Sequence, residues 1–67
     1  MIRCLLWRYM GERKLNVSEL ARETGIPRSG IEALYKDEAL RVDLDAIDKL
    51  CGYFECEIGD LFERVAD

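Results

Sequence analysis

The chain has 67 residues, of which 49% are apolar and 36% are charged. A chain of this length forms one small domain with little room for a buried pocket, and its apolar fraction is too high for a disordered chain. No apolar run approaches the roughly 20 residues that a membrane-spanning helix needs. We therefore expect a single globular domain over residues 1–67, located in the cytoplasm and not in a membrane.

The net charge of −4 is unevenly distributed along the chain. Residues 1–36 carry a net charge of +3, whereas residues 37–67 carry −7. A basic first half can present a positive face even when the whole chain is acidic. The overall charge therefore does not exclude nucleic acid as a partner.

The residues that usually bind metals or perform catalysis are sparse. The chain has no histidine and three cysteines, at Cys4, Cys51 and Cys56, without a Cys-x-x-Cys motif. A structural zinc site uses four ligands, mostly cysteine and histidine, so we expect three reduced, buried thiols and no metal. No cysteine is paired with a base and no glycine-rich phosphate loop is present. The sequence predicts neither an enzyme nor a cofactor.

The spacing of apolar residues predicts five short helices, at residues 2–14, 16–25, 28–36, 43–54 and 58–64. Asn16 is a favourable N-cap, and Glu19 three residues later can complete a capping box. Asp43 is a second N-cap. No run of alternating apolar and polar residues exceeds about four, and no Asn-Gly or Asp-Gly turn occurs. The fold class is therefore predicted to be all-α, with Ile2 and Phe62 facing the core from the first and last helices.

Residues 16–36 fit a helix-turn-helix unit with its turn at residues 23–27. Two helices that cross at a wide angle need a small residue at the crossing, and Ala21 is suitable. The turn needs a residue that tolerates positive φ, which Gly25 supplies, and Ile31 can fill the space between the helices. The alternative is an ordinary helix hairpin that satisfies packing alone.

The chain also resembles the Cro/C1-type (xenobiotic-response-element type) helix-turn-helix proteins of bacteria and phages, especially their small stand-alone members. The matching stretches are LNVSELA at 15–21, ETGI at 23–26, RVDLD at 41–45, DKLC at 48–51 and CEIGDLFE at 56–63. This resemblance implies a compact five-helix, lambda-repressor-like domain. It also implies that the third helix enters the major groove of double-stranded DNA.

The resemblance also implies individual site residues. Base edges would be faced by Arg28, Ser29 and Ala33, and phosphates by Asn16, Val17, Lys36 and Arg41. Two of these roles agree with general chemistry. An arginine at position 28 can bind guanine O6 and N7 bidentately, and backbone N–H groups at a helix start bind phosphate.

Acidic residues set the expected strength of DNA binding. Glu32 lies on the predicted reading helix, where it can pair at i±4 with Arg28 or Lys36 or repel phosphate, and Asp37 and Glu38 follow it. We expect weak, salt-sensitive binding by a monomer, or tight binding of a short palindromic operator by a homodimeric transcription regulator. The alternative is a protein-interaction module, such as an accessory or antitoxin-like subunit with a protein partner.

Overall fold

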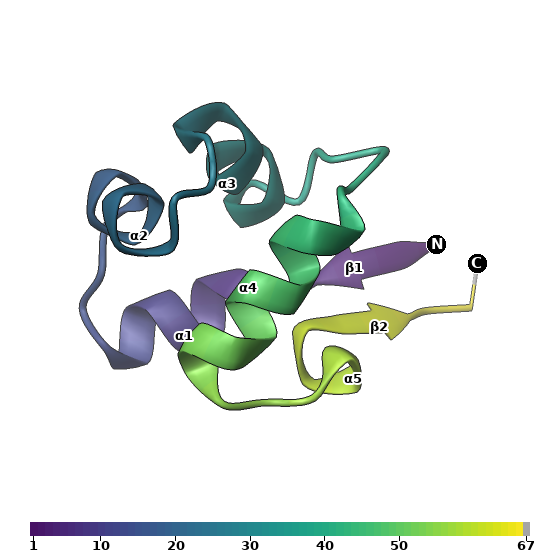
Figure 1. The fold of residues 1–67 in the computed structure, drawn as a ribbon. Helices are drawn as coiled ribbons and strands as arrows, with labels where there is room; N and C mark the ends of the chain where they lie inside the picture. The colour runs from purple at the N-terminus through teal and green to yellow at the C-terminus, as the bar shows by residue number, and fades with distance from the viewer. Residues whose placement is uncertain (67) are drawn as a thin grey trace.

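The computed structural model describes residues 1–66, which form five helices and two short strands. In chain order these are β1 (Ile2–Cys4), α1 (Leu6–Glu12), α2 (Val17–Thr24), α3 (Arg28–Tyr35), α4 (Leu44–Phe54), α5 (Ile58–Leu61) and β2 (Phe62–Arg64). Figure 1 shows α2 and α3 on one side of α1 and α4, with β1 and β2 near the two ends of the chain. Within the described part of the chain, no helix has the length and apolar character required to cross a membrane.

The two strands were not predicted, so the expected all-α class holds for the five helices and is wrong at both ends. β1 pairs with β2 in antiparallel register, with Cys4 opposite Phe62. β1 replaces the start of the helix expected at 2–14, and β2 replaces the end of the helix expected at 58–64. Ile2, predicted to face the core, is 60% exposed on β1, whereas Phe62 is partly buried against the core as expected.

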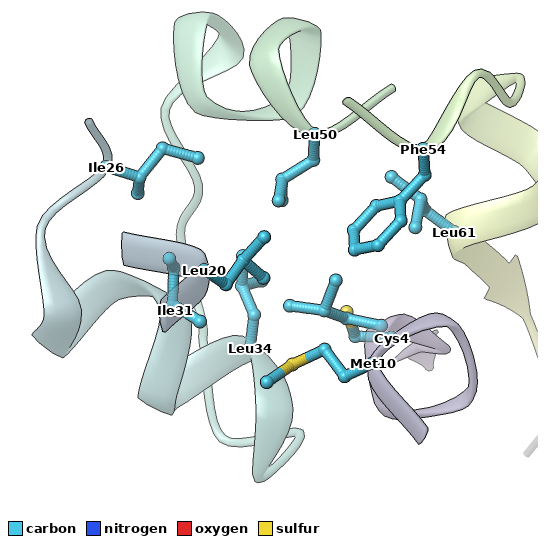
Figure 2. Close-up of a cluster of buried hydrophobic side chains, with 10 residues drawn as sticks. Cys4, Met10, Leu20, Ile26, Ile31, Leu34, Leu50, Phe54 and Leu61 are labelled. Carbon is cyan, nitrogen blue, oxygen red and sulfur yellow. The ribbon is translucent and has the colours of Figure 1, made fainter. Parts of the chain in front are cut away.

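The core lies between the five helices and β1, each of which contributes at least one buried side chain. Figure 2 shows nine labelled side chains pointing toward one another from all five helices, β1 and the turn before α3. The side chains with almost no exposure are Leu6, Met10, Leu20, Ile31, Leu50 and Leu61. Each full burial of a leucine or isoleucine side chain stabilises the fold by about 1.5–3 kcal/mol, so this cluster supplies the main driving force for folding.

All three cysteines are free thiols, but only Cys4 is buried as predicted. Burial raises the pKa of its thiol. Cys51 and Cys56 are half-buried because they flank the end of α4, where the chain turns back through Glu55. Glu55 adopts a left-handed conformation there, with φ 53°. The Cys56 N–H donates to the Cys51 carbonyl at 3.0 Å and closes this turn.

The start of α2 and the turn after it form as the sequence predicts. The Asn16 side chain accepts from the Glu19 N–H at 2.8 Å, and the Glu19 carboxylate accepts from the Asn16 N–H at 3.0 Å, which is a complete capping box. α2 ends at Gly25, which has φ 77° and donates its N–H to the Ala21 carbonyl. The Thr24 hydroxyl donates to the Leu20 carbonyl at 2.7 Å and holds the last turn.

Asp37 joins the end of α3 to the strand β1. It has a left-handed backbone, with φ 58°, and its carboxylate accepts from the Cys4 N–H at 2.9 Å. The second carboxylate oxygen lies 3.7 Å from the Arg3 guanidinium. Asp37 was expected to disfavour DNA binding. The structure also gives it a structural role, because its carboxylate accepts the hydrogen bond of the Cys4 N–H at the edge of the core.

We predict that Asp37→Ala lowers the free energy of unfolding by about 1–2 kcal/mol, because a partly buried N–H loses its acceptor. Asp37→Asn is expected to cost less, since asparagine keeps an acceptor oxygen and tolerates a left-handed backbone. Urea unfolding measures both values. Glu38→Ala, on the exposed neighbour, is the control, and equal losses in Asp37→Ala and Glu38→Ala would contradict the role of Asp37.

Candidate nucleic-acid interface

The helix α3 is held by one apolar face and leaves the other face in solvent. Ile31 and Leu34 are buried in the core, whereas Arg28 and Ser29 in the first turn are exposed. Pro27 is the N-cap residue, with φ −55°, as its place in the sequence predicted. Its ring imposes the φ that the helix start requires, so the position of the first turn of α3 is well defined.

Two of the three residues expected to face DNA bases lie together in this exposed first turn. Arg28 makes no ion pair within the part of the chain that the structure describes, although its charge attracts the Glu32 carboxylate one turn away. Ala33 lies one turn after Ser29 on α3, and it is half-buried. Ser29 and Ala33 both line a hollow between α3 and the segment leading into α4. The structure therefore places Arg28 and Ser29 at the surface and Ala33 beside them.

The four residues expected near phosphates lie at three separate places. Asn16 uses both its side chain and its N–H in the capping box of α2, which leaves Val17 as the next backbone donor. Lys36 is at the end of α3, and Arg41 is exposed in the segment that follows. Arg41 has no ion pair among the described residues.

Glu32 forms its ion pair with Lys36, while Arg28 adds a weaker Coulombic attraction. The Lys36 Nζ lies 3.0 Å from the Glu32 carboxylate, one helical turn away. The hydrogen bond from Lys36 lowers the pKa of Glu32, and the same bond raises the pKa of Lys36. Each group thus stabilises the charged form of the other, and Lys36 must give up this partner in order to bind a phosphate.

Arg22 on α2 is a further exposed basic residue of the helix-turn-helix unit. Sequence spacing alone allows Arg22 either to pair with Glu19 or Glu23 or to contact a phosphate. Glu19 completes the capping box, and Glu23 accepts from the Tyr53 hydroxyl at 2.8 Å. Arg22 is exposed and has no ion pair among residues 1–66. The predicted capping box already indicated that Glu19 would be occupied, whereas the Tyr53 contact joins residues too far apart to be read from the sequence.

Comparisons with known proteins agree with this geometry. A family model described as the Cro/C1-type helix-turn-helix (HTH) DNA-binding domain matches residues 5–67. The chain is 29% identical over 58 residues to the uncharacterized HTH-type transcriptional regulator YozG of Bacillus subtilis (strain 168), covering 87% of this chain and 69% of that protein. The crystal structure of the transcriptional regulator VanUg (Form II) matches with a TM-score of 0.77 and 27% identity, covering 98% of this chain and 87% of that one.

We predict opposite effects of alanine at two glycines of this unit. A Cβ at Gly30 would lie 3.9 Å from the Ile26 side chain, an ordinary contact, so Gly30→Ala should raise the free energy of unfolding by roughly 0.5–1 kcal/mol. Gly25 has φ 77°, and Gly25→Ala should lower that free energy by about 1–2 kcal/mol. Thermal unfolding of both variants tests the pair, and two changes of the same sign would contradict it.

Proposed function

The chain belongs to the family of Cro/C1-type HTH DNA-binding domains, and from that premise we propose that it regulates transcription by reading a specific operator through α3. The operator in this proposal is short and palindromic, and the chain binds it as a homodimer. Two-fold symmetry then requires two half-sites about 34–36 Å apart, one turn of the double helix. No catalytic step is part of the proposal.

The observation that carries the proposal is the exposed Arg28 beside Ser29 in the first turn of α3. An arginine can donate two parallel hydrogen bonds to guanine O6 and N7 in the major groove. The N-terminal residues of a recognition helix are the ones that contact base edges. Arg28 has the guanidinium group that can bind guanine, and it is the first residue of α3.

Phosphate contacts would come from groups on either side of α3. The Val17 N–H at the start of α2 can bind a phosphate oxygen, and Arg22 and Arg41 supply free positive charges. Lys36 contributes only when it leaves Glu32. With few such contacts, binding by one copy should be weak and should weaken further as salt is added.

The direct test is selection of bound duplexes from a random DNA pool, followed by affinity measurements at low salt. We expect the enriched sequences to contain two inverted half-sites about one helical turn apart. Failure of every selected sequence to outcompete random DNA would refute the proposal.

On the selected DNA, Arg28→Ala should cost about 1–3 kcal/mol of discrimination per half-site and relax the preference at one base pair. Fluorescence anisotropy on the matched and mutated operators measures this loss. The control is Arg8→Ala, because Arg8 lies on α1 in the hollow next to Gly59 and Asp60. If the two variants bind equally well, α3 is not the reading helix.

Glu32→Gln should tighten DNA binding. The change removes an acid from α3 and releases Lys36, so the slope of log affinity against log salt should steepen by about 0.9 per copy. Anisotropy over a salt series measures both quantities. Glu55→Gln removes the same charge at the far end of α4 and serves as the control. An unchanged salt slope in Glu32→Gln would show that Lys36 contacts no phosphate.

A further inference from the structure

Two of the three cysteines lie at the two ends of the turn that closes α4. The Cys56 N–H donates to the Cys51 carbonyl at 3.0 Å, and the Glu55 N–H donates to the Gly52 carbonyl at 3.4 Å. These two bonds around the left-handed Glu55 form a Schellman motif. In this motif, the side chain after the left-handed residue often contacts the one whose carbonyl accepts the outer bond. The turn therefore brings the thiols of Cys51 and Cys56 together.

The backbone hydrogen bond also limits how far apart the two cysteines can be. The N···O distance is 3.0 Å. Covalent geometry extends this by one carbonyl and one N–Cα bond, so the two Cα atoms lie at most about 6.9 Å apart. Disulfides usually join Cα atoms that are about 4.4–6.8 Å apart. The reduced chain thus already holds Cys51 and Cys56 at a separation that a disulfide can bridge.

The two side chains also interact with each other. Burial raises the pKa of the Cys51 thiol, and Cys56 raises it further through its charge and a hydrogen bond. Cys56 interacts with Tyr9 of α1 as well. Burial, the charge of Asp60, and the charge and hydrogen bonding of Cys56 all raise the pKa of Tyr9. Both thiols are free and only half-buried, so a small reagent can reach them.

We propose that Cys51 and Cys56 are a reversible redox pair, which a hydroperoxide closes into an intramolecular disulfide across the end of α4. A sensitive cysteine of this kind has a second cysteine beside it that resolves the first oxidation product. The third cysteine, Cys4, is only 6% exposed on β1 and takes no part. The proposal goes beyond the proposed function and does not depend on it.

The chemistry takes two steps and consumes one hydroperoxide. In the first step, the thiolate of one cysteine attacks the O–O bond. An S–O bond forms, the O–O bond breaks, and the leaving oxygen takes up a proton and departs as water or an alcohol. In the second step, the other sulfur attacks this sulfenic acid, so that the S–S bond forms and water leaves. The two thiols lose two electrons and two protons in total, and the hydroperoxide is reduced.

The acidic surroundings affect how fast the pair reacts. The thiolate is the attacking species, and the negative charges of Asp48 and Glu57 add to burial and to Cys56 in raising the pKa of Cys51. Little Cys51 thiolate is therefore present at neutral pH. We expect slow closure at neutral pH and faster closure in mildly alkaline solution.

A disulfide at this turn would act on the helix-turn-helix unit through Tyr53. This residue lies between the two cysteines in the sequence, and its hydroxyl donates to Glu23 of α2 at 2.8 Å. Its ring packs edge-on against Phe54, with 5.0 Å between the ring centroids. Because a cross-link reduces the freedom of the unfolded chain, the oxidised chain should keep this turn and its contact with α2 to a higher temperature.

Peptide mapping of the whole chain after treatment with hydrogen peroxide tests the proposal. The remaining thiols are alkylated in denaturant, and trypsin then cleaves after lysine and arginine. Cys51 and Cys56 fall together in the peptide 50–64, whereas Cys4 falls in the peptide 4–8. We expect the peptide 50–64 to escape alkylation and to be lighter by two hydrogen atoms. Dithiothreitol should restore both of its thiols, and the Cys4 peptide should be alkylated throughout.

Matched variants distinguish this pair from general oxidation. Cys51→Ser and Cys56→Ser should each abolish the cross-link, whereas Cys4→Ala should keep it. Peroxide should raise the midpoint of thermal unfolding of the wild type by roughly 5 °C or more, and it should not raise the midpoint of either serine variant.

Three results would overturn the proposal. The first is a peptide 50–64 whose two thiols both remain open to alkylation after peroxide treatment. The second is a set of cross-links that joins separate chains, or that uses Cys4, in place of the internal one. The third is a disulfide between Cys51 and Cys56 that lowers the unfolding midpoint, because the folded turn would then have to distort in order to form it.

Discussion

The direction of α3 depends on the left-handed backbone of Gly25. Its φ of 77° ends α2 and lets the chain reverse into Ile26, which is buried beneath the turn. The Ile26 N–H donates to the Thr24 hydroxyl at 3.3 Å, so the turn keeps its hydrogen bonds without a longer loop. Because Ile31 is then buried against Leu20, the face of α3 that carries Arg28 has to point outward. The exposed face of α3 is therefore determined by the left-handed backbone of Gly25 and by the packing of Leu20 and Ile31 in the core.

Contacts at both ends of the helix-turn-helix unit attach it to the rest of the domain. The Tyr53 hydroxyl on α4 donates to Glu23 on α2, and Asp37 after α3 accepts from Cys4 on β1. The sheet in turn brings the two ends of the described chain together, with the Val65 N–H donating to the Met1 carbonyl at 2.8 Å. These contacts join distant parts of the sequence, and they limit how far α3 can tilt when it contacts a ligand.

The helix-turn-helix unit was predictable because its signals are local. The capping box at Asn16, the glycine at 25 and Pro27 before α3 each act within a few residues, and all three are confirmed. The two strands were not predictable from the sequence. Each has only three residues, too few to show an alternation of apolar and polar side chains, and β1 pairs with β2 from the opposite end of the chain. For the same reason Asp37 was interpreted only as an acid unfavourable to DNA, because its partner Cys4 lies 33 residues away. The roles of Arg28 and the other site residues in binding DNA remain predictions.

Amide chemical shifts, followed while operator DNA is added to the chain, test most directly whether α3 reads DNA. We predict that the largest changes fall on Arg28 and Ser29 in the first turn of α3, with smaller changes at Val17 and Arg41. The amides of α5 and the end of α4 should change little. Shifts concentrated on α5 instead, with α3 unaffected, would contradict the claim that α3 reads DNA.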